Sequence, residues 1–413
     1  MRGKRYKQTL PLALLCFMNI LGFMLLALIR DNFFEGIKTI TTGVIFVSLL
    51  VICYCLIKLF KMGDPFLLLP VTALLSVGLL MLTRINEAVG KKQMMWFFIS
   101  VAVYFVSFFI YKSIKKRDRL FILYAVVSVG LFLATLIFGR TVNGAKNWIY
   151  IGSQGVQPSE FIRLLFVFAL SALLSKKPDG RFISTEWKKS LFIMLYVYVN
   201  LGFLVIQREW GIAVLFFLIY FSLYFVFGRH RILLAANSVI VALGCFAGYK
   251  VLYHIETRVA MWLDPFSDPS GRGYQIVQSL IAIASGGFTG EGLGNGSPYY
   301  VPLVESDFIF SGICEEFGIL GGIGVILLYF IFVYRGFKIA LSVPDSFDKK
   351  VALGLSAMFS FQIFIILGGV IKLIPLTGIT LPFISYGGSS LVTSFMALGI
   401  LQAISVKEGD SIE

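Results

Sequence analysis

The chain has 413 residues, of which 58% are hydrophobic and 14% charged, and its mean hydropathy is +0.87. This composition is typical of a polytopic membrane protein and excludes an ordinary water-soluble domain. The formal net charge of +14 indicates membrane topology and attraction to anionic lipid head groups rather than nucleic-acid binding, because the basic residues gather between apolar segments.

Twelve apolar segments of roughly 17–25 residues follow one another, each long enough to cross about 30 Å of hydrocarbon as a helix. They predict an all-α polytopic membrane protein with about 12 transmembrane helices. The predicted segments are residues 9–29, 41–60, 65–82, 93–111, 120–138, 158–174, 190–206, 210–227, 232–253, 308–333, 351–371 and 376–404.

Positive charge sets the predicted orientation. The first segment follows a basic stretch, but its apolar run is too long for a cleaved signal peptide, so a permanent first span is predicted. The short loops at 112–119 and 176–189 are dense in Lys and Arg, which by the positive-inside rule places them in the cytoplasm. Both termini are therefore predicted to be cytoplasmic, and the long loop before the tenth segment to face outward.

Two charged residues begin the sixth segment. Glu160 and Arg163 follow Pro158, which suits the first turn of a helix. Their spacing of three places them on one helix face, within reach of an ion pair. A charge at membrane depth costs roughly 2.5–3.5 kcal/mol, so it needs a reason. Two interpretations stay open: a structural ion pair, or an Arg163 that faces a cavity and meets an anionic substrate.

The long polar loop at 261–307 is the predicted site. It holds too many aromatic and aliphatic residues for simple disorder. Its middle, 274–283, predicts a short amphipathic or re-entrant helix at the membrane interface. The glycines at 286–296 permit tight turns and close backbone approach to a ligand, but they match neither a Walker nor a Rossmann loop.

The loop ends at Asp307, for which the sequence leaves two interpretations. An acidic residue just before an apolar helix is typical of an N-cap. The alternative is a carboxylate at the outer membrane interface that serves as a general base toward a sugar hydroxyl. Further along, Glu315 is expected near the helix face of Asp307. Glu316 is expected nearly opposite and hydrogen-bonded or protonated in the bundle, so the two are not expected to share a partner.

The remaining features are less informative. The five cysteines lie in apolar segments and predict small buried side chains rather than a disulfide framework or a zinc site. The two histidines are far apart in the sequence, which argues against a histidine-based metal site. Gly387 and Gly388 lie in the predicted last segment, where they are expected to allow close helix packing.

Five ordered stretches, over roughly 65–404, carry a resemblance to a known family. They are Asn143 to Ile149 with Gln157 to Arg163, Asp264-Pro265 through Gly273 to Ser279, the glycine run, Asp307 to Phe310 with Glu315 to Gly318, and Leu381 to Ser390. Together they resemble the SEDS family (shape, elongation, division and sporulation).

The resemblance implies a peptidoglycan glycosyltransferase that polymerises lipid II at the outer face of the bacterial cytoplasmic membrane, beside a class B penicillin-binding protein. The family's catalytic carboxylate corresponds to Asp307. Its ten-helix core implies an N-terminal two-helix extension at 1–61 and a SEDS-like domain at 62–413, including an extracellular loop at about 254–307. Mg²⁺ is expected to bind through substrate phosphates rather than a dedicated protein site. Substrate contacts are expected at Lys146, Glu160, Arg163, Arg258, Arg272, Tyr274, Gln275, Gln278, Glu315, Ser385 and Tyr386.

The sequence departs from the family's usual pattern near these positions. The departures are Glu305-Ser306 for a usual His-Thr, Arg208-Glu209 for Pro-Asp, Glu291 for a common lysine, and Arg163 for lysine. Two other classes stay open beside the enzyme: a flippase for lipid-linked precursors, and a non-catalytic scaffold of the cell-wall synthesis complex. The sequence leaves open a role in elongation, division or sporulation.

Overall fold

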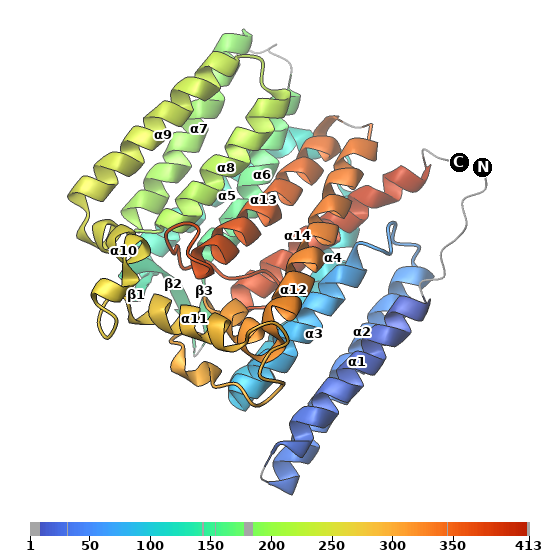
Figure 1. The fold of residues 1–413 in the computed structure, drawn as a ribbon. Helices are drawn as coiled ribbons and strands as arrows, with labels where there is room; N and C mark the ends of the chain where they lie inside the picture. The colour runs from blue at the N-terminus through green and yellow to red at the C-terminus, as the bar shows by residue number, and fades with distance from the viewer. Residues whose placement is uncertain are drawn as a thin grey trace.

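The computed structural model describes residues 9–30, 32–142, 144–152, 154–176, 185–344 and 346–410, and within these ranges the side chains from 10 to 406. Within these ranges, twelve helices are long and apolar enough to cross a membrane, which confirms the predicted all-α polytopic architecture (Figure 1). They are α1 (Thr9–Leu28), α2 (Phe33–Leu59), α3 (Leu68–Ile85), α4 (Glu87–Ser113), α5 (Phe121–Phe138), α6 (Pro158–Ser175), α7 (Glu186–Ile206), α8 (Trp210–Phe227), α9 (Arg231–Val251), α12 (Ile309–Ser342), α13 (Ser346–Val370) and α14 (Gly388–Asp410).

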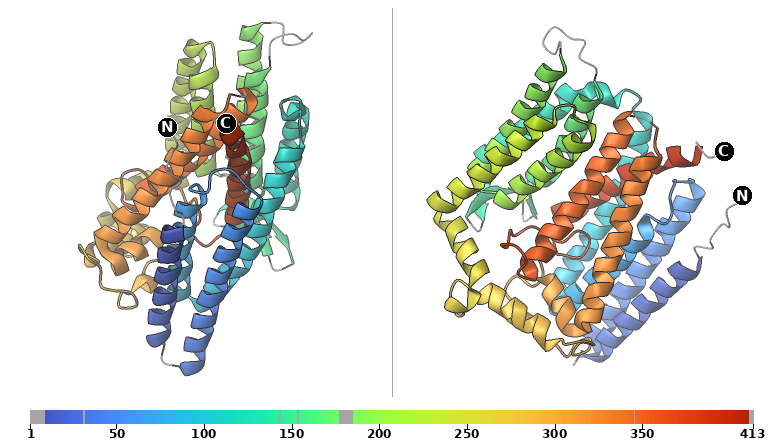
Figure 2. Two further views of the ribbon diagram at one scale, coloured as in Figure 1. Left: turned by 90° about the vertical axis from the view of Figure 1, so that its right-hand side faces the viewer. Right: turned by 45° about the horizontal axis from the view of Figure 1, so that its top comes forward.

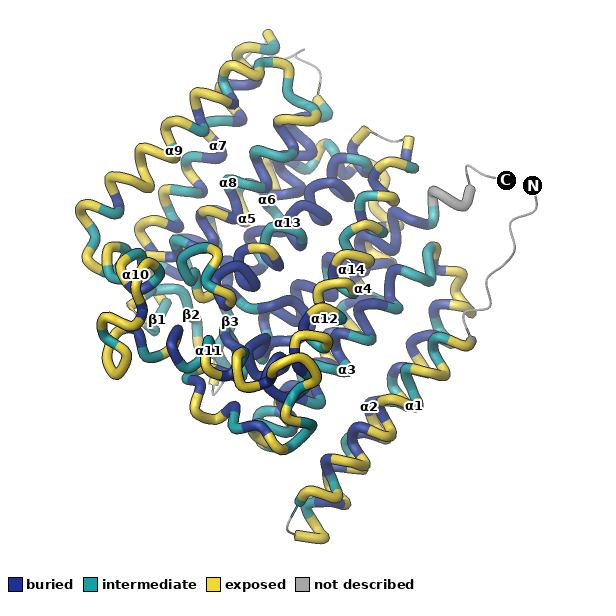
Figure 3. Tube along the Cα trace, in the orientation of Figure 1, coloured by how far each residue is buried: buried dark blue, intermediate teal, exposed yellow. Residues whose placement is uncertain are grey.

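The centre of the bundle is formed by α6, α13 and α14. More than four-fifths of each apolar span is buried there, against 17% for α9 at the periphery (Figure 3). The hairpin α1–α2 lies at one side and packs mainly on α3 and α4 (Figure 2). Its outward side chains are large and apolar, as expected for helices that face lipid. The central helices carry the polar residues that lipid would not tolerate.

A small antiparallel sheet lies between α5 and α6 and was not predicted. Its strands are β1 (Arg140–Val142), β2 (Ala145–Ile151) and β3 (Gln154–Val156), in the order β1-β2-β3. The signal was present in the sequence, because Asn143-Gly144 after the β-branched residues Thr141 and Val142 is a strong hairpin pattern. Gly144, with φ of +83°, adopts the left-handed backbone that such a turn requires.

The long loop contains more helix than the sequence indicated. It holds α10 (Tyr253–Leu263), α11 (Tyr274–Ser285) and two short 3₁₀ turns, η2 (Pro265–Ser267) and η3 (Pro298–Tyr300); a third, η1 (Arg117–Leu120), precedes α5. The predicted short amphipathic helix is confirmed by α11. The sheet, α10 and α11 all lie at the end of the bundle opposite the start of α1 and the end of α14 (Figures 1 and 2).

The predicted last segment, 376–404, begins too early. The chain from 371 to 387 has no regular helix, and α14 starts at Gly388. The physical reason is local, because Pro375 and Pro382 interrupt helices and Gly378 has φ of +73°. Close packing at Gly388 does occur, since a Cβ there would lie 2.2 Å from the ring of Trp96 on α4.

Candidate active site

Asp307 lies immediately before α12, but it does not cap that helix. Phe308 occupies the N-cap position, and the first turn receives no side-chain cap bond. The N-cap interpretation is therefore wrong. The partly buried carboxylate instead turns toward the loop after α13: a Cβ on Gly378 would lie 3.4 Å from Asp307 Oδ2 and 3.9 Å from Arg258 Nη2. The carboxylate and a guanidinium thus flank the same exposed glycine.

Arg258 is held in place by the same loop. Its Nη1 donates to the carbonyls of Leu376 and Thr377, at 3.2 and 3.1 Å. Because α10 carries Arg258 while α12 follows Asp307, the loop at 371–387 joins two elements that are about fifty residues apart in sequence. This placement could not be read from spacing.

The backbone that carries Asp307 is fixed from behind by Ser385 and Tyr386. The Ser385 hydroxyl donates to the carbonyl of Ser306 at 2.5 Å, and the Tyr386 amide donates to the carbonyl of Glu305 at 2.7 Å. Both residues were predicted as substrate contacts. The structure shows a positioning contact for each, while the Tyr386 side chain stays partly exposed.

The surroundings of Asp307 suit a proton acceptor. Burial raises the pKa of the Asp307 carboxyl, and the charge of Glu305 raises it further. The Ser306 hydroxyl and the charge of Arg258 act in the opposite direction. A base whose pKa lies above the usual range for aspartate holds an abstracted proton more firmly, which favours general-base chemistry near neutral pH.

A histidine, His254, lies near Arg258. Burial lowers the pKa of His254, and the charges of Arg258 and Arg208 lower it further. The His254 ring lies 6.1 Å from the ring of Trp210 at the start of α8. His254 and Trp210 were missed by sequence reasoning, and Arg208 was noted only as a departure from the family pattern. The available signal was the altered motif at 207–211.

Several buried polar atoms around this place lack hydrogen-bond partners among the described residues. They are Asn147 Oδ1, Glu209 Oε2, Trp210 Nε1, His254 Nε2 and Thr377 Oγ1. The segments that carry these atoms lie against one another. Thr377 packs on Gly211, and Asn147 hydrogen-bonds the Glu209 carboxylate. Buried polar groups are normally satisfied, so such a cluster indicates a polar ligand or water.

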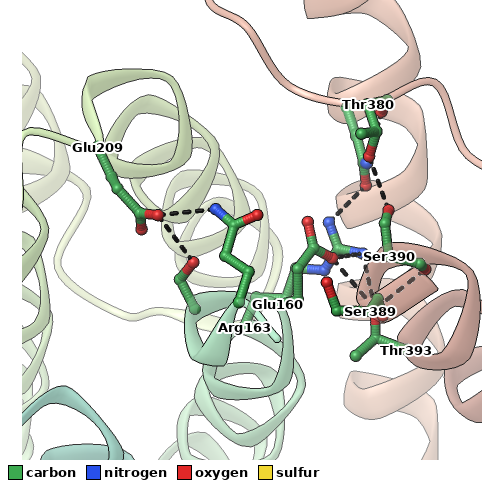
Figure 4. A network of polar contacts seen from close by, with 10 residues as sticks. Glu160, Arg163, Glu209, Thr380, Ser389, Ser390 and Thr393 are labelled. Atoms are coloured by element: carbon green, nitrogen blue, oxygen red, sulfur yellow. Dashed lines mark hydrogen bonds and ion pairs between the residues drawn. The ribbon is translucent and has the colours of Figure 1, made fainter. Parts of the chain in front are cut away.

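Glu160 and Arg163 form the predicted ion pair, with Oε2 and Nη2 2.5 Å apart. Arg163 also donates to Gln362 Oε1 at 2.7 Å, and Thr393 donates to Glu160 at 3.1 Å, which ties α6 to α13 and α14 (Figure 4). Gln362 in turn donates to the carbonyl of Thr380 at 2.9 Å, in the same loop that holds Arg258. The structural interpretation of the pair is therefore realised; a substrate contact of either residue stays a prediction.

Glu209 lies next to this network. It accepts hydrogen bonds from Gln157 at 2.7 Å and Ser159 at 3.1 Å (Figure 4). Burial raises the pKa of the Glu209 carboxyl, and hydrogen bonds from Gln157, Asn147 and Ser159 oppose that rise. The altered motif thus keeps a carboxyl group at the start of α8, joined to the start of α6.

Other predicted substrate residues lie apart from Asp307 or make different contacts. Lys146 Nζ donates to the carbonyl of Leu136 at 2.6 Å, at the end of α5. Arg272 is exposed, lies 3.4 Å from Asp268 and donates to the Tyr253 hydroxyl at 3.2 Å. The remaining predicted residues of the long loop lie on α11, with Tyr274 and Gln278 partly buried and Gln275 exposed.

Glu315 and Glu316 bind the glycine-rich loop at 286–297. Glu315 Oε1 accepts from the Ser297 amide at 2.8 Å, and Glu316 Oε2 accepts from the Gly294 amide at 3.2 Å. The two glutamates therefore bind different residues, as expected, although both residues lie in the same loop, which packs against the interruption of α12 at Gly318. The expectation that Glu316 is hydrogen-bonded within the bundle is confirmed.

Comparison with known proteins identifies the family of the chain. Residues 53–409 match a family model for FtsW, RodA and SpoVE, described as "Cell cycle protein". The protein named peptidoglycan glycosyltransferase RodA from Mycobacterium tuberculosis (strain ATCC 25618 / H37Rv) is 33% identical over 425 residues, covering 97% of this chain and 90% of the relative. Stage V sporulation protein E of Bacillus subtilis (strain 168) is 34% identical over 369 residues, covering 84% and 98%.

Solved structures share the fold. A chain from work described as "Structural coordination of polymerization and crosslinking by a peptidoglycan synthase complex" superposes with a TM-score of 0.71 at 27% identity, covering 84% of this chain and 98% of that one. The crystal structure of the rod shape determining protein RodA of Thermus thermophilus gives a TM-score of 0.60 at 26% identity, covering 84% and 97%. Since the family model matches most of the length of this chain, the chain belongs to the SEDS family, the family of FtsW, RodA and SpoVE.

Proposed function

We propose that the chain is a peptidoglycan glycosyltransferase that polymerises lipid II, with Asp307 as its general base. The observation that carries the proposal is the position of the Asp307 carboxylate. It lies beside Gly378, on which the Arg258 guanidinium also borders, at one end of a membrane-spanning bundle. The names of the relatives support the same activity, since several are called peptidoglycan glycosyltransferases.

The proposed reaction joins two lipid-linked sugars. Asp307 accepts the proton of the acceptor hydroxyl while that oxygen attacks the anomeric carbon of the donor sugar. The bond from that carbon to the diphosphate breaks, and the polyprenyl diphosphate leaves with the bonding electrons. Arg258 offers positive charge to the diphosphate. Arg208 lies close enough to Arg258 that both lower the pKa of His254, and it adds a second positive charge. The unpartnered atoms of Trp210 and Thr377 offer hydrogen bonds to polar groups of the substrate.

Mg²⁺ would fit this arrangement through the substrate. The donor set holds a second carboxylate, Glu305, whose charge acts on Asp307, and Mg²⁺ typically takes one or two carboxylates with phosphate oxygens and water. Glu305 would hold the ion beside the diphosphate, and the ion would supply neutralisation of the leaving group's charge. Asp307 and Arg258 would keep their own tasks, as proton acceptor and diphosphate contact.

We also place the site at the outer face of the bacterial cytoplasmic membrane, with both termini cytoplasmic. The supporting observation is that the exposed basic loop between α4 and α5 lies at the bundle end opposite the sheet, α10 and α11 (Figure 1). A class B penicillin-binding protein is the proposed partner, supported by the likeness to a chain from a peptidoglycan synthase complex.

The test is polymerisation of lipid II by the purified protein in detergent with Mg²⁺, alone and with candidate class B partners. Asp307→Asn is expected to lower turnover by about 10²–10⁴-fold, because the amide accepts no proton. Glu256→Gln, an exposed carboxylate on α10, is the matched control and should retain turnover. Absence of glycan product from wild type that still binds lipid II, with every partner, would contradict the proposal and favour the flippase or scaffold classes. Retained turnover in Asp307→Asn would contradict the role of the base.

A further inference from the structure

Arg84, in the last turn of α3, grips the glycine-rich loop at 286–297. Its Nη2 donates to the carbonyls of Gly294 and Gly296, at 2.6 and 3.1 Å. Its Nε lies 3.2 Å from Glu316 Oε1, a carboxylate that is fully buried. One planar guanidinium therefore contacts two backbone carbonyls and one carboxylate. A lysine ammonium, as a single point charge, would not match this fork.

The loop is also joined to α12 through its backbone. At Gly318 the helix has φ of 68° and ψ of −174°, so the regular pattern of hydrogen bonds is interrupted there. The loop supplies the missing partners. Amides of residues 291 and 292 donate to the carbonyls of 315 and 316, while amides of 319 and 320 donate to the carbonyls of 287 and 288. The side chains of Glu315 and Glu316 then bind the amides of Ser297 and Gly294.

This junction lies ten residues before the catalytic carboxylate. The chain from 298 to 307 is held at its start by Arg84 and the two glutamates, and near its end by Ser385 and Tyr386. The two attachments together restrict the conformations open to the segment that presents Asp307, because each fixed backbone position removes conformational freedom.

The N-terminal hairpin contacts the same junction. Ile29, just after α1, lies so close to Gly294 that a Cβ on the glycine would meet its Cδ1 at 2.5 Å. Arg30 Nη2 donates to the carbonyl of Thr83 at 2.8 Å, next to Arg84 in the chain. A cavity of about 140 Å³ is lined by Leu26, Ile29, Arg30 and Glu35 of the hairpin region and by Arg84. Residues 1–52 lie outside the matched family model, so this contact is an addition to the region that the model covers.

We propose that Arg84 is a positioning residue for the transfer reaction, and that it couples the outer end of the N-terminal hairpin to Asp307 through the glycine-rich loop. The inference rests on the proposed function. Arg84 holds the loop on the kinked part of α12, the loop fixes the start of the segment 298–307, and that segment presents Asp307. The hairpin packs against the loop at Gly294 and keeps the end of α3 in place.

The alternative is a purely structural role, in which Arg84 only holds α3 against α12. The molecule offers a matched control, because a second ion pair joins the other ends of the same two helices. Arg335 on α12 donates from Nε to Asp64 Oδ2 at 2.9 Å, just before α3, far from the glycine-rich loop. A general role in helix packing would make the two arginines equivalent.

The experiment compares Arg84→Lys and Arg335→Lys in the full chain. We expect Arg84→Lys to lower kcat by about ten- to hundredfold, because a small displacement of a catalytic group has effects of that size. KM should stay within about twofold, since ground-state binding is left in place. Amide hydrogen exchange should accelerate at 294–307 in Arg84→Lys and stay unchanged there in Arg335→Lys. Equal effects of the two variants on kcat and exchange would overturn the proposal.

A second variant tests the hairpin. Ile29→Ala combined with Arg30→Gln should give an intermediate loss of kcat and faster exchange at 294–297; wild-type values of both would overturn the coupling to the hairpin. These measurements also distinguish failure of the proposed function from failure of the proposed role of Arg84. An inactive wild type defeats the proposed function, whereas the exchange comparison still decides whether Arg84 holds the loop.

Discussion

At the scale of single residues, the site depends on a carboxylate whose environment opposes its charge. Burial and the neighbouring Glu305 raise the pKa of Asp307, while Ser306 and Arg258 counter them. As the proposed base, Asp307 must be ionised to accept a proton. The active fraction therefore falls as pH drops through the raised pKa, and the loss begins at a higher pH than for an ordinary aspartate.

Glu305→Gln should move this acid limb to lower pH, because it removes a charge that raises the pKa of Asp307. The measurement is the pH profile of kcat for lipid II polymerisation at saturating Mg²⁺, which compensates for a weakened ion contact. Arg258→Gln should move the limb in the opposite direction while lowering overall turnover. A limb that stays at one pH in both variants would contradict ionisation of Asp307 as its cause.

At the scale of elements, the interruption of α12 is the feature that gives the glycine-rich loop its place. Gly318 has a backbone conformation that is essentially restricted to glycine, and a Cβ there would lie 2.4 Å from the Gly290 amide nitrogen and the Phe288 carbonyl oxygen. The loop glycine that faces it is constrained as well, since Gly290 has φ of +86°.

Gly318→Ala should destabilise the protein by about 1–3 kcal/mol and release the loop. Gly324→Ala is the control on the same helix, because a Cβ there meets nothing within 4 Å. That change should be neutral or stabilising by about 0.5–1 kcal/mol. Thermal unfolding in detergent measures both; equal midpoints would show that the interruption carries no strain against a side chain.

Elements were predictable to different degrees, for physical reasons. The long apolar runs were found because a helix that crosses a membrane must show one in its own sequence. The small sheet was missed because its strands are short, and its evidence was a single Asn-Gly turn. The last helix was started too early because the apolar residues of 371–387 resemble a span, while its prolines and Gly378 prevent one.

At the scale of the whole molecule, the buried pair Glu160–Arg163 joins α6 to α13 and α14. Removing one partner leaves a buried charge, so Arg163→Met should destabilise by about 3–5 kcal/mol. The double variant with Glu160→Gln should recover part of that loss, because the uncompensated carboxylate is also removed. Unfolding in a denaturant series measures the free energy of unfolding of each variant. Strictly additive losses of that free energy would argue against a mutually dependent pair.

Orientation can be tested across the same bundle. In a variant without native cysteines, Tyr299→Cys should react with a membrane-impermeant maleimide in intact cells, because this exposed residue lies in the long loop. Lys115→Cys, exposed between α4 and α5, should react only after permeabilisation. The reverse pattern would invert the proposed topology and place the site in the cytoplasm.

The sequence by itself determined the membrane class, the existence of twelve spans and the family, and it made Asp307 the candidate base, because hydropathy and motif spacing are local properties of the chain. Only the tertiary structure decided which groups meet. Asp307 and Arg258 flank Gly378 in the loop after α13, Arg163 donates to Gln362 and Thr393, and Arg84 contacts a loop some two hundred residues away in the sequence. The physical reason is that a buried charge must find partners wherever packing brings them, and packing between distant helices leaves no mark in the spacing of either one.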